Sequence, residues 1–115
     1  IAGAQLVFGL TRKAPPGATL SAVERLSQAG GSFRSYGVGA LMITYVGAGR
    51  IDGFFEAAVF AWDVAAALLI AEEAGAVVNA EAKRAADREP VPILAATPAL
   101  YPRLAAELPF VAAGA

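Results

Sequence analysis

The feature that most constrains the fold is the alternation of short apolar segments with segments of helical periodicity. The short, β-rich segments are predicted to be strands, and they lie at residues 4–10, 51–59, 76–78 and 91–96. The periodic segments are predicted to be helices, and they lie at residues 20–29, 37–49, 62–73 and 98–108. Residues 32–36 are expected to be extended. Several strands are apolar on both faces, which is typical of a parallel sheet covered by helices. We therefore expect a single α/β domain over residues 1–115, with a mainly parallel sheet layered with helices.

The composition favours a buried core over a membrane span or a nucleic-acid surface. Hydrophobic residues make up 57% of the chain and charged residues only 17%. The most apolar runs, residues 41–48 and 64–71, are shorter than the roughly 20 residues that a bilayer-spanning helix needs. A net charge of −1 offers no basic field for DNA or RNA.

The sequence contains no cysteine and no histidine, and this excludes several kinds of chemistry. Disulfides, thiolate zinc sites and cysteine nucleophiles are ruled out, as are the Ser-His-Asp triad and imidazole metal ligands. Carboxylates, hydroxyls, a few arginines and lysines, and the backbone remain. A bound metal ion is therefore expected to be a hard cation with oxygen ligands, such as Mg²⁺.

Asp63, at the start of a predicted helix, is the first candidate for a functional side chain. One interpretation makes it a helix N-cap, whose side-chain oxygen accepts hydrogen bonds from the free N–H groups of the first turn. The other makes it a cation ligand, because a carboxylate beside Trp62 at the positive end of a helix is well placed to hold one. The residues alone leave both interpretations open.

Glu56 and the segment Gly37-Val38-Gly39 are further candidates. Glu56 is a charge that follows two aromatic residues of its predicted strand, and it either lies on the solvated face of an edge strand or faces a cleft. Gly-x-Gly is weak evidence for a loop that approaches a ligand closely, and helix packing explains it as well.

Residues 34–78 carry three motifs in a characteristic order and spacing. They are RSYGVGA at residues 34–40, VGAGRIDGFFE at 46–56 and WDVAAALLIAEEAGA at 62–76. Together they resemble the C-terminal half of the inositol monophosphatase family. The later ILAATPALYPRLAAEL, residues 93–108, resembles the final strand and helix of that family.

The resemblance implies the C-terminal domain of the inositol monophosphatase and fructose-bisphosphatase-like fold. It implies a cytoplasmic, Mg²⁺-dependent and lithium-sensitive phosphomonoesterase, a hydrolase that acts on a small phosphorylated polyol or sugar and forms a homodimer. By the same resemblance, Asp63 is a metal ligand and Glu56 binds substrate hydroxyls. Gly37, Val38 and Gly39 line the substrate pocket.

The chain also departs from the family pattern. Val38 replaces a usual Ser or Thr, Gly39 a usual Ala, Ala67 a usual Gly, and Ala76 the second Gly of the EAGG ending. The acidic motifs of the family's first half, including Asp-Pro-x-Asp-Gly-Thr, have no match. We therefore expect this chain to be the C-terminal half of a longer phosphatase, supplying one metal ligand and part of the pocket but no catalytic residue. The alternative is a non-catalytic binding or assembly module that keeps the fold.

Overall fold

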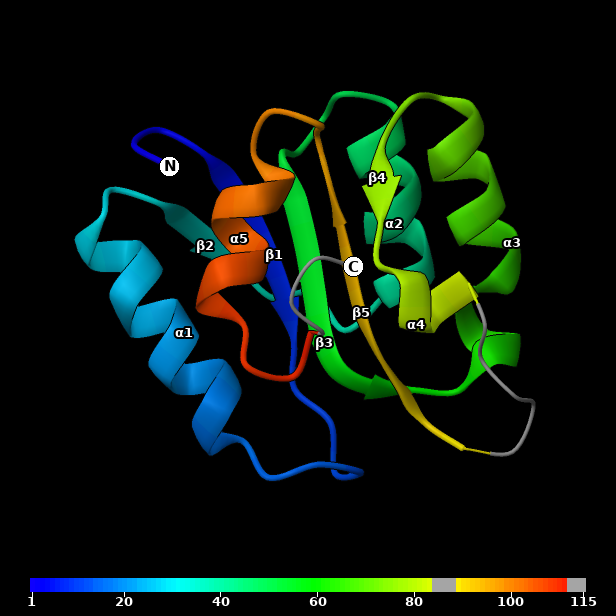
Figure 1. Cartoon of the computed structure of the whole chain (residues 1–115), viewed down its shortest axis with the longest axis horizontal. Coiled ribbons are helices and arrows are strands. Elements are labelled where there is room, and N and C mark those ends of the chain that lie inside the picture. Colours follow the sequence, from blue (N-terminus) through cyan, green and yellow to red (C-terminus); the bar gives the residue numbers. More distant parts are fainter. Residues whose placement is uncertain (84–88, 112–115) are drawn as a thin grey trace.

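A five-stranded sheet forms the centre of the computed structural model, which describes residues 1–83 and 89–111. Its strands are β1 (Gln5–Gly9), β2 (Ser32–Arg34), β3 (Gly53–Val59), β4 (Val77–Val78) and β5 (Val91–Ala96). They lie in the spatial order β2-β1-β3-β5-β4 (Figure 1). Each predicted strand, and the segment expected to be extended, is present.

The sheet is mixed, with one reversed strand. β1 runs parallel to both of its neighbours, β2 and β3. β5 runs antiparallel to β3 and to β4, so the other four strands share one direction. The predicted α/β fold with a mainly parallel sheet is confirmed, and β5 is its antiparallel exception.

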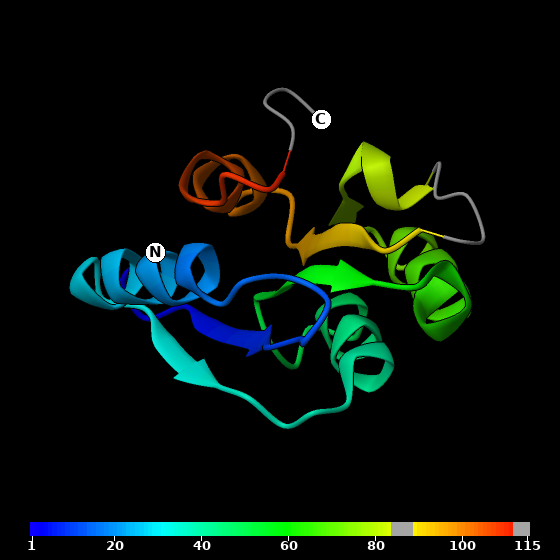
Figure 2. The same cartoon turned by 90° about the horizontal axis from the view of Figure 1, so that it is seen from below.

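Helices cover both faces of the sheet. They are α1 (Gly17–Gln28), α2 (Gly39–Gly47), α3 (Ala61–Glu73), the single turn α4 (Ala80–Lys83) and α5 (Tyr101–Glu107). The helices α1 and α5 pack on one face, and α2 and α3 pack on the opposite face (Figure 2).

Two adjacent phenylalanines of β3 show how the sequence produces two cores. Successive side chains of a strand point to opposite faces of the sheet. Phe54 therefore packs with α2 and α3, and Phe55 packs with α1 and α5. Both rings are at most 2% exposed. A strand that is apolar on both faces thus becomes a central strand of a covered sheet.

The helix ends differ from the predicted ones by a few residues. α1 begins at Gly17, three residues before the prediction, and α5 begins at Tyr101, three residues after it. At α5 the backbone N–H groups of Leu100 and Tyr101 both donate to the carbonyl of Thr97, which makes a tight turn before the helix.

The charged segment 81–89 of the sequence lies largely outside the described residues. Its first part belongs to α4, and the structure describes nothing over residues 84–88. Within residues 1–83 and 89–111, no helix has the length and apolarity that crossing a bilayer demands.

Candidate active site

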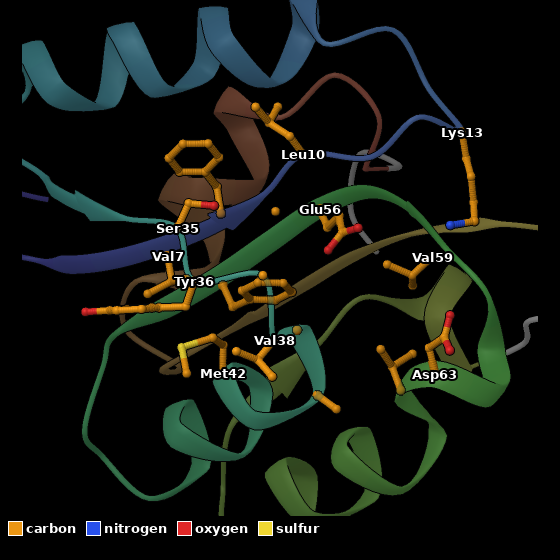
Figure 3. A pocket seen from close by; sticks show the side chains of 17 residues that line it. Val7, Leu10, Lys13, Ser35, Tyr36, Val38, Met42, Glu56, Val59 and Asp63 are labelled. Carbon is orange, nitrogen blue, oxygen red and sulfur yellow. The ribbon is translucent and has the colours of Figure 1, made fainter.

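A cavity of about 430 Å³ opens beside the carboxyl end of β1, where side chains of β1 and β3 meet the starts of α2 and α3 (Figure 3). The chain leaves β1 through α1 on one face of the sheet and leaves β3 through α3 on the other face. Such a change of side between neighbouring parallel strands opens a crevice, and α/β proteins commonly bind ligands there. The lining residues are Val7, Phe8, Gly9, Leu10, Lys13, Ser35, Tyr36, Gly37, Val38, Gly39, Ala40, Met42, Phe54, Glu56, Val59, Asp63 and Val64.

Glu56 reaches the cavity from β3, directly opposite Gly9 of β1. β3 has β1 on one side and β5 on the other, so the interpretation of Glu56 as part of an edge strand is wrong. Burial raises the pKa of the Glu56 carboxyl above its ordinary value. The nearby ammonium of Lys13 opposes this shift, and the negative charge of Asp63 adds to it.

Asp63 lines the same cavity from the first turn of α3. It is not the N-cap, because Phe60 holds that position and Asp63 is the third residue of the helix. Its carboxylate makes no hydrogen bond to any residue that the structure describes. A carboxylate in the first turn is favoured by the helix dipole, and this one remains available to a ligand.

Gly37, Val38 and Gly39 form the part of the wall that leads into α2. Gly37 has a φ of +74°, in the left-handed region that favours glycine, and it turns the chain toward the helix. The side chain of Val38 is 48% exposed, so it presents an apolar surface where a hydroxyl would otherwise stand. All five residues that the sequence singled out therefore line one cavity.

Lys13 is a lining residue that sequence reasoning missed. It lies in the loop after β1, where its backbone N–H donates to Thr11 Oγ1 at 3.1 Å. Its Nζ atom lies 5.1 Å from the centroid of the Phe60 ring. The signal was present in the sequence, since Lys13 lies three residues beyond the end of a predicted buried strand, and ligand-binding residues gather at such carboxyl ends.

Trp62, the neighbour of Asp63 in the sequence, lies on the surface of the molecule. Its indole is 64% exposed and stacks on the ring of Phe60, with centroids 4.4 Å apart and planes inclined by 8°. Lys13, Phe60 and Trp62 thus form a layered group beside the cavity.

The donor set fits one side of a hard-cation site. Asp63 and Glu56 offer carboxylate oxygens, the ligand type that Mg²⁺ prefers. Among the residues that the structure describes, however, no group of three or more acidic, histidine or cysteine side chains is close enough to hold a metal ion. The described residues therefore suit the role of supplying some, but not all, of the ligands of a metal site.

A sequence model of the inositol monophosphatase family matches residues 4–113. The chain belongs to this family. Nus factor SuhB of Escherichia coli is 42% identical over 79 residues, which are 67% of this chain and 30% of that protein. The inositol-1-monophosphatase of Mesorhizobium japonicum is 52% identical over 46 residues, 40% of this chain and 17% of that protein.

Solved structures agree with this assignment. The extragenic suppressor protein suhB of Bartonella henselae superposes with a TM-score of 0.77 at 28% identity, over 94% of this chain and 42% of that one. The family resemblance and the fold that it implied are thereby confirmed. The chain spans less than half the length of the relatives it matches.

Proposed function

We propose that the cavity is part of the active site of a Mg²⁺-dependent phosphomonoesterase that hydrolyses a small polyol or sugar phosphate, with inositol 1-phosphate as the first candidate. The observation that carries this proposal is the convergence of Asp63, Glu56 and the segment 37–39 on one cavity at the carboxyl end of β1. Histidinol phosphate, fructose 1,6-bisphosphate and 3′-phosphoadenosine phosphates are the alternative substrates within the same chemistry.

In this proposal Asp63 supplies one ligand to Mg²⁺. When bound, the ion neutralises phosphate oxygens and lowers the pKa of a bound water. Asp63 suits this role because its carboxylate lines the cavity without a hydrogen bond to the described residues. The remaining ligands and the groups that activate water would come from outside residues 1–115.

Glu56 would orient the alcohol part of the substrate. An ionised carboxylate only accepts hydrogen bonds, so it recognises hydroxyl groups. Lys13 favours the ionised form of Glu56 and thereby preserves this accepting capacity. The main chain of Gly37, Val38 and Gly39 would line the opposite wall, where Val38 gives an apolar surface. The family resemblance further implies a homodimer in the cytoplasm.

The test is Asp63→Asn in the natural gene product that contains residues 1–115. We expect kcat to fall about 100-fold, as is typical when a group that stabilises transition-state charge is removed, and the dependence on Mg²⁺ to change. Glu24→Gln, which neutralises an exposed carboxylate on α1, is the control. Unchanged turnover and unchanged Mg²⁺ dependence in the Asp63 variant would refute the assignment.

The second candidate is a binding or assembly module without catalytic activity. Several relatives bear the name Nus factor SuhB, which is the name of a factor rather than of a hydrolase. The two candidates differ in one assay, phosphatase activity of the natural gene product with Mg²⁺. Activity supports the first candidate, and its absence supports the second.

A further inference from the structure

We propose that Gly9 is a specificity-determining residue, because its missing side chain leaves the space in which the Glu56 carboxylate lies. Gly9 would thereby set the direction from which Glu56 recognises substrate hydroxyls. This inference rests on the proposed function, which makes Glu56 the group that binds the alcohol part of the substrate.

The contact between Gly9 and Glu56 follows from the strand register. The two residues are direct partners across the parallel pair β1–β3, and both line the cavity. A Cβ atom added to Gly9 would overlap Oε1 of Glu56. It would lie 2.6 Å from Cδ and 3.1 Å from Cγ of the same side chain. No side chain at position 9 is therefore compatible with the position of this carboxylate.

A second glycine borders the same carboxylate. A Cβ atom added to Gly39, at the start of α2, would lie 3.6 Å from Oε1 of Glu56 and 3.3 Å from Cζ of Phe54. The carboxylate thus lies in a slot between a glycine of β1 and a glycine of α2. The two walls differ, since an alanine at position 39 would meet Oε1 at an ordinary contact distance and an alanine at position 9 would displace it.

The backbone gives no reason for glycine at position 9. Gly9 is absent from the glycines with positive φ, so an alanine can adopt its conformation. The atoms that an alanine would meet belong to the end of a flexible side chain, which can rotate away. Gly9→Ala should therefore move Glu56 without unfolding the strand. An effect on substrate recognition without a loss of stability separates this role from a structural one.

The experiment measures KM and kcat for two substrates in the natural gene product. Inositol 1-phosphate offers hydroxyls to Glu56, whereas phenyl phosphate offers none. We expect Gly9→Ala to raise KM for inositol 1-phosphate about tenfold or more, as expected for the loss of a hydrogen bond to a charged group. The KM for phenyl phosphate and the melting temperature should stay near the wild-type values. Gly17→Ala is the matched control, because a Cβ atom at Gly17 meets nothing within 4 Å.

A double variant shows whether the effect passes through Glu56. Glu56→Ala should raise KM for inositol 1-phosphate, and Gly9→Ala added to it should have no further effect. If Gly9→Ala alone fails to fold, the double variant must regain the stability of Glu56→Ala, because the overlapping carboxylate is gone.

The outcomes distinguish this inference from the proposed function. A normal KM in Gly9→Ala, together with a raised KM in Glu56→Ala, overturns only the role of Gly9. The same holds if the double variant fails to fold or shows additive losses. A normal KM in Glu56→Ala overturns the role of Glu56, and the role of Gly9 falls with it.

Discussion

At the scale of single residues, Glu56 combines a cost to the fold with a proposed use in recognition. Its carboxylate is held in a slot between glycines, and burial raises its pKa. Burial of a charge is unfavourable unless partners compensate it. The positive charge of Lys13 compensates part of the cost of burying the Glu56 charge, and the negative charge of Asp63 increases that cost. A residue that is unfavourable for folding and faces a cavity is a good candidate for function.

This cost predicts how Glu56→Gln changes stability with pH. A carboxyl whose pKa is raised by folding contributes stability that is fully present below its unfolded pKa, about 4.3, and is lost as the pH rises through the folded pKa. Glu56→Gln removes the charge and escapes this loss. We expect the variant to melt a few degrees above the wild type at pH 7, with the advantage disappearing toward pH 4.

Thermal melts in the presence of a chelator check this prediction without a bound metal ion. The control is Glu24→Gln, which lies exposed on α1 and should show no such trend. A Glu56→Gln variant that melts below the wild type at pH 7 would contradict the prediction. So would an advantage that persists unchanged at pH 4.

The sequence predicted correctly which side chains line the cavity. It was wrong about the N-cap, a role that depends on the backbone conformation. The position of Glu56 among aromatics and the position of Asp63 at a helix start identified two residues that line the cavity. The N-cap role of Asp63 was wrong, because a cap is defined by backbone dihedrals, and Phe60 has the extended ones. The role of Gly9 had no local signal, since it depends on the pairing of β1 with β3.

At the scale of elements, the helices α2 and α3 pack so closely that small residues must lie between them. A Cβ atom added to Gly47 of α2 would lie 3.0 Å from Cα of Ala71 and 3.3 Å from Cβ of Ala74. Backbone atoms cannot rotate away as a side-chain end can. The buried residues Val46 and Leu68 pack in the same core. Gly47 therefore determines how closely the two helices approach each other.

Gly47→Leu should separate the two helices and destabilise the fold. Overpacking of a well-packed core typically costs about 1–3 kcal/mol. Replacing glycine gains up to about 1 kcal/mol of helix propensity, which compensates only part of that cost. We expect a lower midpoint of unfolding in urea. Ala66→Leu places the same side chain on the exposed face of α3 and should leave the midpoint nearly unchanged. Equal midpoints for the two variants would show that the close approach of Gly47 to Ala71 does not limit the size of the side chain at position 47.

Elements were predicted well because apolar runs and glycine breaks mark them locally. Each strand segment and each long helix is present, and the errors lie at the ends. The reversal of β5 relative to β3 was not predicted, because direction is set by which strands become neighbours. Residues 37–49 contain glycines, which are unfavourable in a helix, yet α2 forms as predicted, since Met42, Ile43 and Val46 are buried against the sheet.

At the scale of the whole molecule, a considerable apolar surface stays uncovered. The exposed large apolar side chains are Leu10, Leu20, Tyr36, Val38, Leu41, Trp62, Leu69 and Ile70. Some of them, with Tyr45 and Arg50, line a second cavity of about 440 Å³. Single exposed apolar residues are normal, but contiguous patches usually mark an interface. The sequence indicated this surplus through its 57% hydrophobic content and 17% charged content.

This surface predicts that residues 1–115 produced alone will self-associate. Burial of apolar area on association is favourable by about 25 cal/mol per Å², and a net charge of −1 offers little repulsion to oppose it. We expect the mass measured by light scattering to rise with protein concentration in the micromolar range. The rise should be smaller in the natural gene product if additional chain covers the same surface. A monodisperse monomer of residues 1–115 at high concentration would contradict the prediction, because it would mean that the uncovered side chains are dispersed too widely to form an interface.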